Sequence, residues 1–124
     1  MNPFPDDISQ SILRAYSNLQ SGVAASAGKV RSTARLLANP REASRLQLGD
    51  VLVMRATDPG WTPAFSLISG LALEVGGQLS HGAIVAREYG LPAVVNVPEA
   101  TRRIRDGQTV TVDGTAGRVY LEGN

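Results

Sequence analysis

The sequence has no cysteine and only one histidine and one lysine among its 124 residues. Without cysteine, the chain has no disulfide, no thiolate nucleophile and no cysteine-ligated zinc site. A single histidine with few clustered carboxylates also fails to provide a set of metal ligands, so no metal site is expected. The lone lysine, Lys29, does not follow a glycine-rich phosphate loop. The chain is therefore not expected to bind and cleave ATP by itself.

An excess of one charge and a long apolar run are missing as well. Lysine and arginine total 12 against 11 acidic residues, which gives a net charge of +1. A chain this neutral offers no broad basic surface for phosphates, so nucleic acid is not an expected partner. The first ten residues, "MNPFPDDISQ", lack the basic start and apolar core of a signal peptide, and no apolar run approaches about 18 residues. These absences predict a cytoplasmic protein without a membrane segment.

The residues that are present predict a helix followed by one folded domain. Between Pro5 and Gly22, apolar residues recur at helical spacing, which predicts an amphipathic N-terminal helix assigned to residues 1–20. With 43% hydrophobic residues, the remaining residues 21–124 can bury one core and form a single domain. The helix is expected to pack on the sheet or on a partner.

The domain shows strand patterns that alternate with helix patterns. Alternating residues predict two short strands within 23–36, although residues 34–46 taken alone have a helical pattern. An apolar strand is predicted at 51–54, and a helix is predicted to start at Thr62 and Pro63. Further segments predict a strand at 71–75, a helix at 80–89, a strand at 92–97, a short helix at 98–104 and a terminal hairpin turning at Asp113 and Gly114. The pattern predicts a mixed α/β sandwich.

The only histidine, His81, stands at the predicted start of the helix at 80–89. Ser80 is a good N-cap residue, and a helix N-terminus favours an anion. Gly77 and Gly82 bring no side-chain bulk, so the ring is expected to be accessible. Neutral imidazole is a competent nitrogen nucleophile near neutral pH. The residues alone leave two interpretations open, a phosphoryl-accepting histidine and a capping or packing residue.

The spacing of apolar residues in the predicted helix at 80–89 indicates which of its side chains face the core. Ile84 and Val85 are expected to face inward, while Arg87 and Glu88 face outward. Gly90 is expected to end the helix.

The stretch "GGQLSHGAIVAREYGLPAVV" resembles the mobile phosphohistidine domain of phosphoenolpyruvate-utilising enzymes, such as phosphoenolpyruvate synthase, pyruvate phosphate dikinase and rifampicin phosphotransferase. The resemblance continues through "GDVLV" and "TDPGWTP" upstream and "DGQTVTVDGTAGRVY" downstream, and covers residues 21–122. It implies a swivelling β/β/α fold in which His81 accepts a phosphoryl group. The residues expected to support the site are Gly76, Gly77, Ser80, Gly82 and Arg87.

The resemblance also implies a relay. The histidine would carry a phosphoryl group from a site on an ATP-grasp or phosphoenolpyruvate-binding domain to an acceptor on another domain or chain. ATP or phosphoenolpyruvate, with Mg²⁺, is expected on those partners and no cofactor in this chain, so the chain would be a phosphotransferase component and not a complete enzyme. The alternative is a non-catalytic binding or regulatory module that keeps the fold without its partner domains.

Two residues depart from the family pattern, and a few others allow more than one role. Leu79 replaces a threonine that is phosphorylated in some members, which puts that regulation in doubt, and Asn96 replaces a usual glycine whose left-handed backbone asparagine can adopt. Trp61 either lines a docking surface or fills the core. A run of arginines on the short helix before the next "DG" turn could steer a phosphorylated partner, but it is expected to be a solvated face: Arg102, Arg103 and Arg105.

Overall fold

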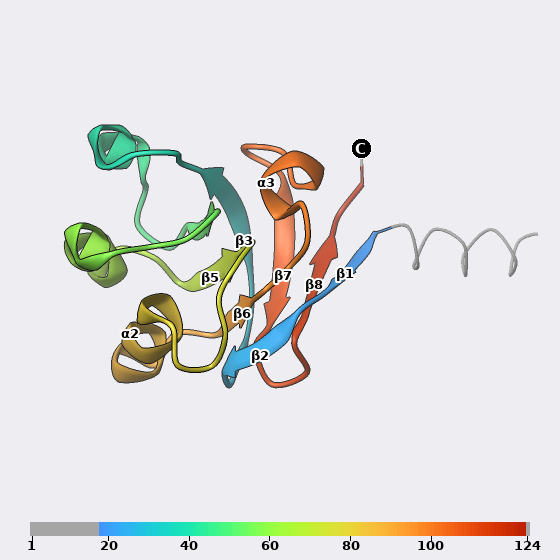
Figure 1. Cartoon of the computed structure of the whole chain (residues 1–124). Coiled ribbons are helices and arrows are strands. Elements are labelled where there is room, and N and C mark those ends of the chain that lie inside the picture. The colour runs from blue at the N-terminus through green and yellow to red at the C-terminus, as the bar shows by residue number, and fades with distance from the viewer. Residues whose placement is uncertain (1–17, 124) are drawn as a thin grey trace, which may run out of the picture.

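The computed structural model describes residues 18–123, which form one curved sheet with the helical segments 40–45, 59–66 and 81–89 on one side and the short helix 100–103 apart from them (Figure 1). Most of the predicted N-terminal helix lies outside the described residues. Its last residues do not form a helix: Leu19–Ser21 is strand β1, because these residues pair with the C-terminal strand. No helix among the described residues is long and apolar enough to cross a membrane.

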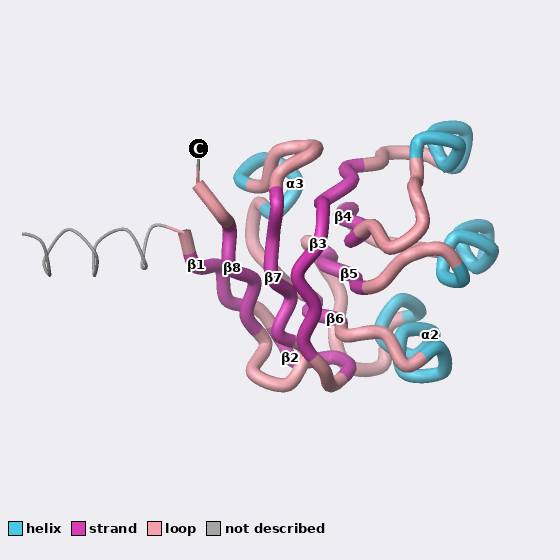
Figure 2. The backbone as a smooth tube through the Cα atoms, turned by 180° about the vertical axis from the view of Figure 1, so that it is seen from behind, coloured by secondary structure: helices cyan, strands magenta, loops and turns pink. Residues whose placement is uncertain are grey.

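Eight strands form the sheet in the order β1-β8-β7-β3-β4-β5-β6-β2. Strands β3, β4, β5 and β6 run parallel, and the remaining pairs are antiparallel (Figure 2). The other strands are β2 (Val23–Ser26), β3 (Lys29–Leu36), β4 (Val51–Met54), β5 (Gly70–Leu73), β6 (Ala93–Val95), β7 (Thr109–Asp113) and β8 (Arg118–Leu121).

Strands β1 and β2 follow each other in the chain but occupy opposite ends of the strand order. This arrangement is possible because the sheet curls back on itself, so that one segment, residues 19–26, closes it at both edges. Gly22, between the two strands, donates its N–H to the Gly117 carbonyl at 2.9 Å. At the outer end, the Leu121 N–H donates to the Asn18 carbonyl at 2.7 Å, so the two ends of the described chain lie side by side.

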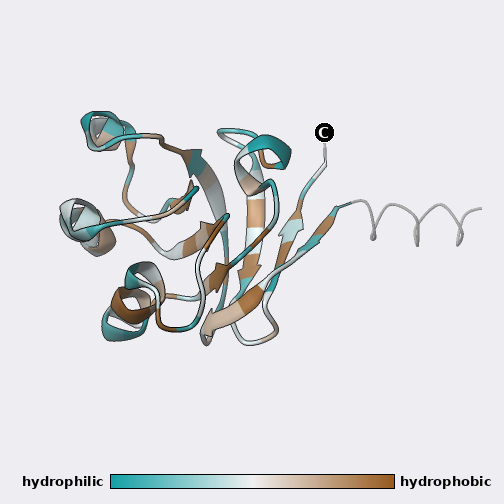
Figure 3. Ribbon diagram, in the orientation of Figure 1, coloured by the Kyte–Doolittle hydropathy of each residue, from teal (hydrophilic) through white to brown (hydrophobic). Residues whose placement is uncertain are grey.

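The curled sheet and its helices make three layers with two apolar cores. Every residue of β4, β5 and β6 is buried, as expected for parallel strands that are covered on both faces. In β7 and β8, buried residues alternate with more exposed ones, because only one face of these strands meets a core. One core lies between the two halves of the sheet, and the other lies between the central strands and the helices (Figure 3). The predicted β/β/α sandwich is confirmed.

Three helical segments connect the parallel strands, and a fourth, at residues 100–103, leads from β6 to the antiparallel strand β7. They are the 3₁₀ helices η1 (Pro40–Arg45) and η2 (Pro59–Ser66) and the α-helices α2 (His81–Tyr89) and α3 (Ala100–Arg103). The ambiguous segment 34–46 is resolved into the end of β3 followed by η1, whose N-cap Asn39 accepts from the Arg41 N–H at 3.0 Å. The helix expected to start at Thr62 starts earlier, at Pro59, because Asp58 caps it through the Gly60 N–H at 2.8 Å.

The structure decides the roles of Trp61 and of the turn between β7 and β8. Trp61 is 3% exposed and fills the core beneath η2. The turn between β7 and β8 is more than a hairpin turn, because a side chain at Gly114 would lie 1.8 Å from the Ser26 carbonyl oxygen. The turn therefore presses against the end of β2, a contact between distant segments that the local turn pattern does not contain.

Candidate functional site

The site is built at one edge of the sheet, where the parallel strands end. Thr57 follows β4 by three residues, and His81 begins the helix that follows β5. Strands β4 and β5 are neighbours that pair in parallel from Val51 to Met54. The carboxyl ends of neighbouring parallel strands lie at the same edge, which is where open α/β sheets bind ligands. This topology brings together two residues that are 24 positions apart.

The imidazole of His81 is half-buried and is contacted from two directions. Its Nδ1 lies 3.1 Å from the Thr57 hydroxyl oxygen. The buried ring of Phe65 stands nearly perpendicular to it, with 6.4 Å between ring centroids and an interplanar angle of 86°. Within residues 18–123, Nε2 has no hydrogen-bond partner. One nitrogen is therefore engaged by the protein while the other remains available.

Ser80 occupies the N-cap position of α2, but its side chain does not cap the helix. The hydroxyl instead donates to the Gly77 carbonyl at 2.7 Å and closes the turn before His81. The free N–H groups of the first helical turn therefore have no side-chain cap from Ser80, and such groups can hold an anion. The expected position of Ser80 is correct, whereas the expected capping bond is absent.

Gly82 is required by close packing, which differs from the open space expected around the ring. A Cβ at this position would lie 2.5 Å from Leu73 Cδ1 and 2.9 Å from Thr57 Oγ1. Helix α2 therefore approaches β5 and Thr57 more closely than any other residue would allow. At Gly77 a Cβ would meet nothing within 4 Å, so the space expected there is present. At Gly76 a Cβ would lie 2.9 Å from Ser80 Oγ, which keeps the turn before His81 narrow.

Arg87 belongs to the framework of the site and does not simply face solvent. Its Nε donates to the Ala25 carbonyl at 2.7 Å, and a terminal nitrogen donates to the Gln78 carbonyl. The side chain of Gln78 in turn donates to the Ala24 carbonyl at 3.3 Å. These bonds join α2, strand β2 and the loop before His81, so Arg87 fixes the loop that positions the histidine.

The remaining helix residues follow the prediction except for Ile84, which is 41% exposed where it was expected to face inward. Val85 is buried, as predicted. Gly90 ends the helix with φ +68°, and Asn96 has φ +54°, the left-handed backbone expected of it. Leu79, two residues before His81, is 85% exposed. Two large apolar side chains, Leu79 and Ile84, therefore lie on the surface near the histidine in the sequence.

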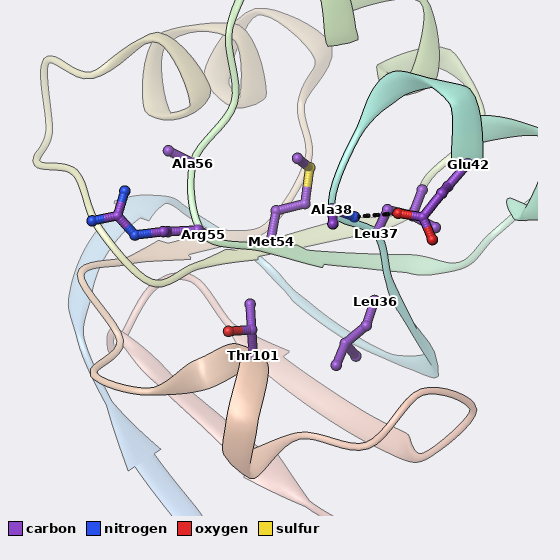
Figure 4. A pocket seen from close by; sticks show the side chains of 8 residues that line it. All are labelled: Leu36, Leu37, Ala38, Glu42, Met54, Arg55, Ala56 and Thr101. Carbon is purple, nitrogen blue, oxygen red and sulfur yellow. Dashed lines mark hydrogen bonds between the residues drawn. The ribbon is translucent and has the colours of Figure 1, made fainter.

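A cleft of about 430 Å³ opens along the same edge of the sheet (Figure 4). It reaches Ala56, the residue before Thr57, and lies between the loop after β3 and α3. The Glu42 carboxylate on its wall is already engaged, because it accepts from the Ala38 N–H at 2.8 Å and from Arg45 at 3.2 Å. The residues that line the cleft are Leu36, Leu37, Ala38, Glu42, Met54, Arg55, Ala56 and Thr101. Among the described residues no three histidine or acidic side chains gather into a possible metal site.

Glu74, the residue after β5, anchors the short helix α3. Its carboxylate accepts from the Thr101 hydroxyl and from the Thr101 N–H, the latter at 2.8 Å. These hydrogen bonds, aided by the charges of Arg55 and Arg102, hold the pKa of Glu74 below its ordinary value. The bonds favour the ionised carboxylate, so Glu74 ties α3 to the strand edge most firmly when it is charged.

Acid should weaken the fold through Glu74. A lowered pKa in the folded protein stabilises the fold above the unfolded value, about 4.3 for glutamate, and this contribution is lost as the pH falls through the folded value. We expect the free energy of unfolding of the wild type, measured with urea, to fall as the pH drops below about 4.3. The fall should be smaller in Glu74→Gln. Glu88→Gln, at an exposed position on α2, is the control and should keep the wild-type pH dependence. Equal curves for Glu74→Gln and the wild type would contradict the role of Glu74.

Sequence reasoning placed His81 correctly at the start of a helix but missed Thr57 and Phe65. Thr57 is the first residue of the "TDPGWTP" stretch that carries part of the resemblance, but that pattern assigned it no contact with His81. No local pattern marks Phe65, and both residues reach His81 only through the fold. The signal that could have found them is the pairing of β4 with β5, which places the segment after β4 beside the segment after β5. The three arginines Arg102, Arg103 and Arg105 are exposed and lie on or just after α3.

Residues 46–117 match the family described as "PEP-utilising enzyme, mobile domain". Rifampicin phosphotransferase from Streptomyces sviceus is 54% identical over 101 residues, which is 82% of this chain and 11% of that protein. Prodigiosin synthesizing transferase PigC from Serratia marcescens is 46% identical over 82% of this chain and 12% of its own length. Phosphoenolpyruvate synthase from Aeropyrum pernix is 44% identical over 82% of this chain and 13% of its own length. The chain thus spans about a tenth of the length of these relatives.

Solved structures agree with the fold. The solution structure of Enzyme I (nEIt) is 34% identical, with a TM-score of 0.57, over 66% of this chain and 34% of that one. Aconitase X from Thermococcus kodakaraensis superposes with a TM-score of 0.65 over 85% of this chain and 98% of that one, at 13% identity. The second likeness concerns the arrangement of strands and helices alone.

Proposed function

Because this chain belongs to the family of mobile domains of PEP-utilising enzymes, we propose that His81 is its phosphoryl-accepting residue and that the acceptor atom is Nε2. The observation that carries the proposal is the contact between His81 Nδ1 and Thr57 Oγ1, which engages one ring nitrogen and leaves the other toward a partner. The chain is a carrier, and the reaction it serves is completed by other domains.

The chemistry follows from the tautomer that the contact can hold. When Nδ1 carries the proton, its N–H donates a hydrogen bond to the Thr57 oxygen. Nε2 then has a free lone pair and needs no general base. Nε2 attacks the phosphorus of the donor, the N–P bond forms, and the bond from phosphorus to the leaving oxygen of the donor breaks. The uncapped N–H groups at the start of α2 are suited to the added negative charge. An atom of the acceptor later attacks the same phosphorus, the N–P bond breaks, and its electron pair returns to Nε2, which restores the neutral ring.

The donor and acceptor sites belong to other domains in this proposal. ATP or phosphoenolpyruvate, with Mg²⁺, would be held by an ATP-grasp or phosphoenolpyruvate-binding domain, because phosphoryl transfer depends mainly on charge neutralisation and positioning. The short span of this chain relative to its relatives supports that division of roles. The cytoplasmic location expected from the sequence is part of the same proposal.

The test supplies the missing parts in trans. In one mixture, rifampicin phosphotransferase from Streptomyces sviceus, with its own mobile domain deleted, is combined with this chain, labelled ATP and Mg²⁺. In a second mixture, phosphoenolpyruvate synthase from Aeropyrum pernix, also without its mobile domain, is combined with this chain, labelled phosphoenolpyruvate and Mg²⁺. We expect a phosphoryl adduct on this chain that acid removes and base preserves. An adduct at a residue other than His81, or none with either donor, would overturn the proposal and favour a non-catalytic module.

Thr57 should matter for the rate of labelling. Thr57→Val keeps the shape of the side chain but removes the oxygen that accepts from Nδ1. We expect the labelling rate of His81 to fall about 5-fold, in line with the loss of one hydrogen bond. Thr62→Val, in η2 and half-buried, serves as the control and should leave the rate unchanged. An unchanged rate for Thr57→Val would show that the contact does not select the tautomer.

A further inference from the structure

One hydrogen bond does not hold an imidazole ring in a single orientation. The second side-chain torsion of histidine is broad, and a half-turn exchanges Nδ1 with a carbon. The Thr57 contact, at 3.1 Å, lies at the long end of the range for hydrogen bonds. A half-turn loses this bond, so the Thr57 contact distinguishes Nδ1 from the carbon. A second contact that restrains the plane of the ring would keep the bond formed and Nε2 facing outward.

The structure supplies that second contact through Phe65. We infer that Phe65 is a positioning residue that, together with Thr57, fixes the orientation of the His81 ring and so selects Nε2 as the atom that is phosphorylated. This inference rests on the proposed function of His81 and adds a residue to it. The two rings stand at 86° to each other, an edge-to-face arrangement that aromatic rings favour.

Phe65 can act in this way because its own position is fixed. The side chain is 1% exposed and belongs to the core between the sheet and the helices. Its ring also contacts the ring of Tyr89, with 6.0 Å between centroids. Since His81 is the first residue of α2 and Tyr89 the last, Phe65 contacts side chains from both ends of the helix that carries the histidine.

Both contacts come from the same connection of the chain. Thr57 immediately precedes Asp58, the N-cap of η2, and Phe65 lies near the end of η2. The Asp58 carboxylate accepts from the Gly60 N–H at 2.8 Å and fixes the start of this helix. The connection between β4 and β5 therefore presents a polar contact and an aromatic contact to one ring as a single rigid unit.

The test uses potassium phosphoramidate, which phosphorylates histidine without any partner protein. The ring nitrogen attacks phosphorus, the P–N bond of the reagent breaks, and ammonia leaves with the electron pair. Phosphorus-31 NMR then distinguishes an adduct on Nδ1 from one on Nε2, and nitrogen-15 shifts give the tautomer ratio of the free ring. The wild type should yield one adduct, on Nε2.

Phe65→Met keeps an apolar side chain of similar volume and removes the ring. We expect the rate at Nε2 to fall about 2- to 10-fold, which corresponds to the loss of one aromatic pair, with an Nδ1 adduct appearing and the tautomer ratio shifting. Phe65→Tyr, which keeps the ring, should restore the wild-type pattern. Trp61→Phe is the matched control, because Trp61 is also buried in η2 but makes no ring contact with His81 among the described residues.

The outcomes separate the inference from the proposed function. If Phe65→Met keeps the single Nε2 adduct and the tautomer ratio of the wild type, the inference is overturned, whatever the partner proteins do. If Phe65→Met is too unstable to assay, nuclear Overhauser effects between the two rings of the wild type decide the matter, and their absence overturns it. A chain that reacts at Nε2 with the reagent but accepts nothing from any partner would contradict the relay alone.

Discussion

Replacing His81 by alanine is expected to abolish phosphoryl labelling, a loss limited only by the detection of the assay. The ring is the only imidazole in the chain, so this substitution removes the one side chain that can form a phosphohistidine. The fold should survive, because the ring is half-buried and makes one hydrogen bond and one aromatic contact. Together these contacts account for about 1–3 kcal/mol of the free energy of unfolding.

A shape control sharpens this test. In His81→Asn, a side-chain oxygen or nitrogen can occupy the place of Nδ1 beside Thr57, while the atom corresponding to Nε2 is absent. This variant should be closer to the wild type in urea unfolding and just as inactive in labelling. Ser80→Ala removes the neighbouring hydroxyl, which bonds only to Gly77 in the described chain, and should retain labelling. Labelling that persists in His81→Asn would refute the assignment of the acceptor.

Replacing Gly114 by alanine is expected to cause a large loss of stability, because among the described glycines an added Cβ would meet its closest neighbour here. The new Cβ would lie 1.8 Å from the Ser26 carbonyl oxygen and 2.7 Å from the Ala93 nitrogen. Both are backbone atoms, so no side chain can rotate away, and the β7–β8 turn must move off β2 and β6. We expect the free energy of unfolding to fall by roughly 3 kcal/mol or more.

The matched control for this substitution is Gly77→Ala, because a Cβ at Gly77 would meet nothing within 4 Å. Urea unfolding of both variants, compared at their midpoints, should show a large shift for Gly114→Ala and a change within about 0.5 kcal/mol for Gly77→Ala. A pair of equal midpoints would mean that the turn does not press on β2 as the structure describes.

The sequence contained enough information for the layers of this fold. Uninterrupted apolar residues at 51–54 indicated a strand buried on both faces, and the alternation at 109–113 indicated a strand with one buried face; both are observed. Helix α2 was predicted because Ser80 and Gly90 mark its ends. Strand β1 was not, since residues 19–21 continue a helical pattern and become a strand only by pairing with β8.

The candidate site was predictable only at its centre. The resemblance identified His81 and included Thr57 in the "TDPGWTP" stretch, but it gave Thr57 no role, and none of its motifs included Phe65. Their contacts with the ring depend on which strands lie side by side. Ile84 was assigned to the core by periodicity alone, and it is exposed because the helix turns a narrower apolar face toward the sheet. Arg87 was expected to face outward by periodicity and to support the site by the resemblance; its bonds to two carbonyl groups join it to β2 and to the loop before His81, contacts that no local pattern predicts.

The adjacent ends of the described chain have a mechanical consequence. Asn18 and Leu121 are joined by a hydrogen bond at one edge of the sheet, whereas α2 lies on the opposite side of the molecule (Figure 1). If neighbouring domains were joined to this domain at that edge alone, the domain could rotate as a rigid body about the edge, and the imidazole would lie far from the axis of rotation. A modest rotation of the whole domain about that edge would then move the His81 ring over a long distance, and the contacts inside the sandwich would stay unchanged.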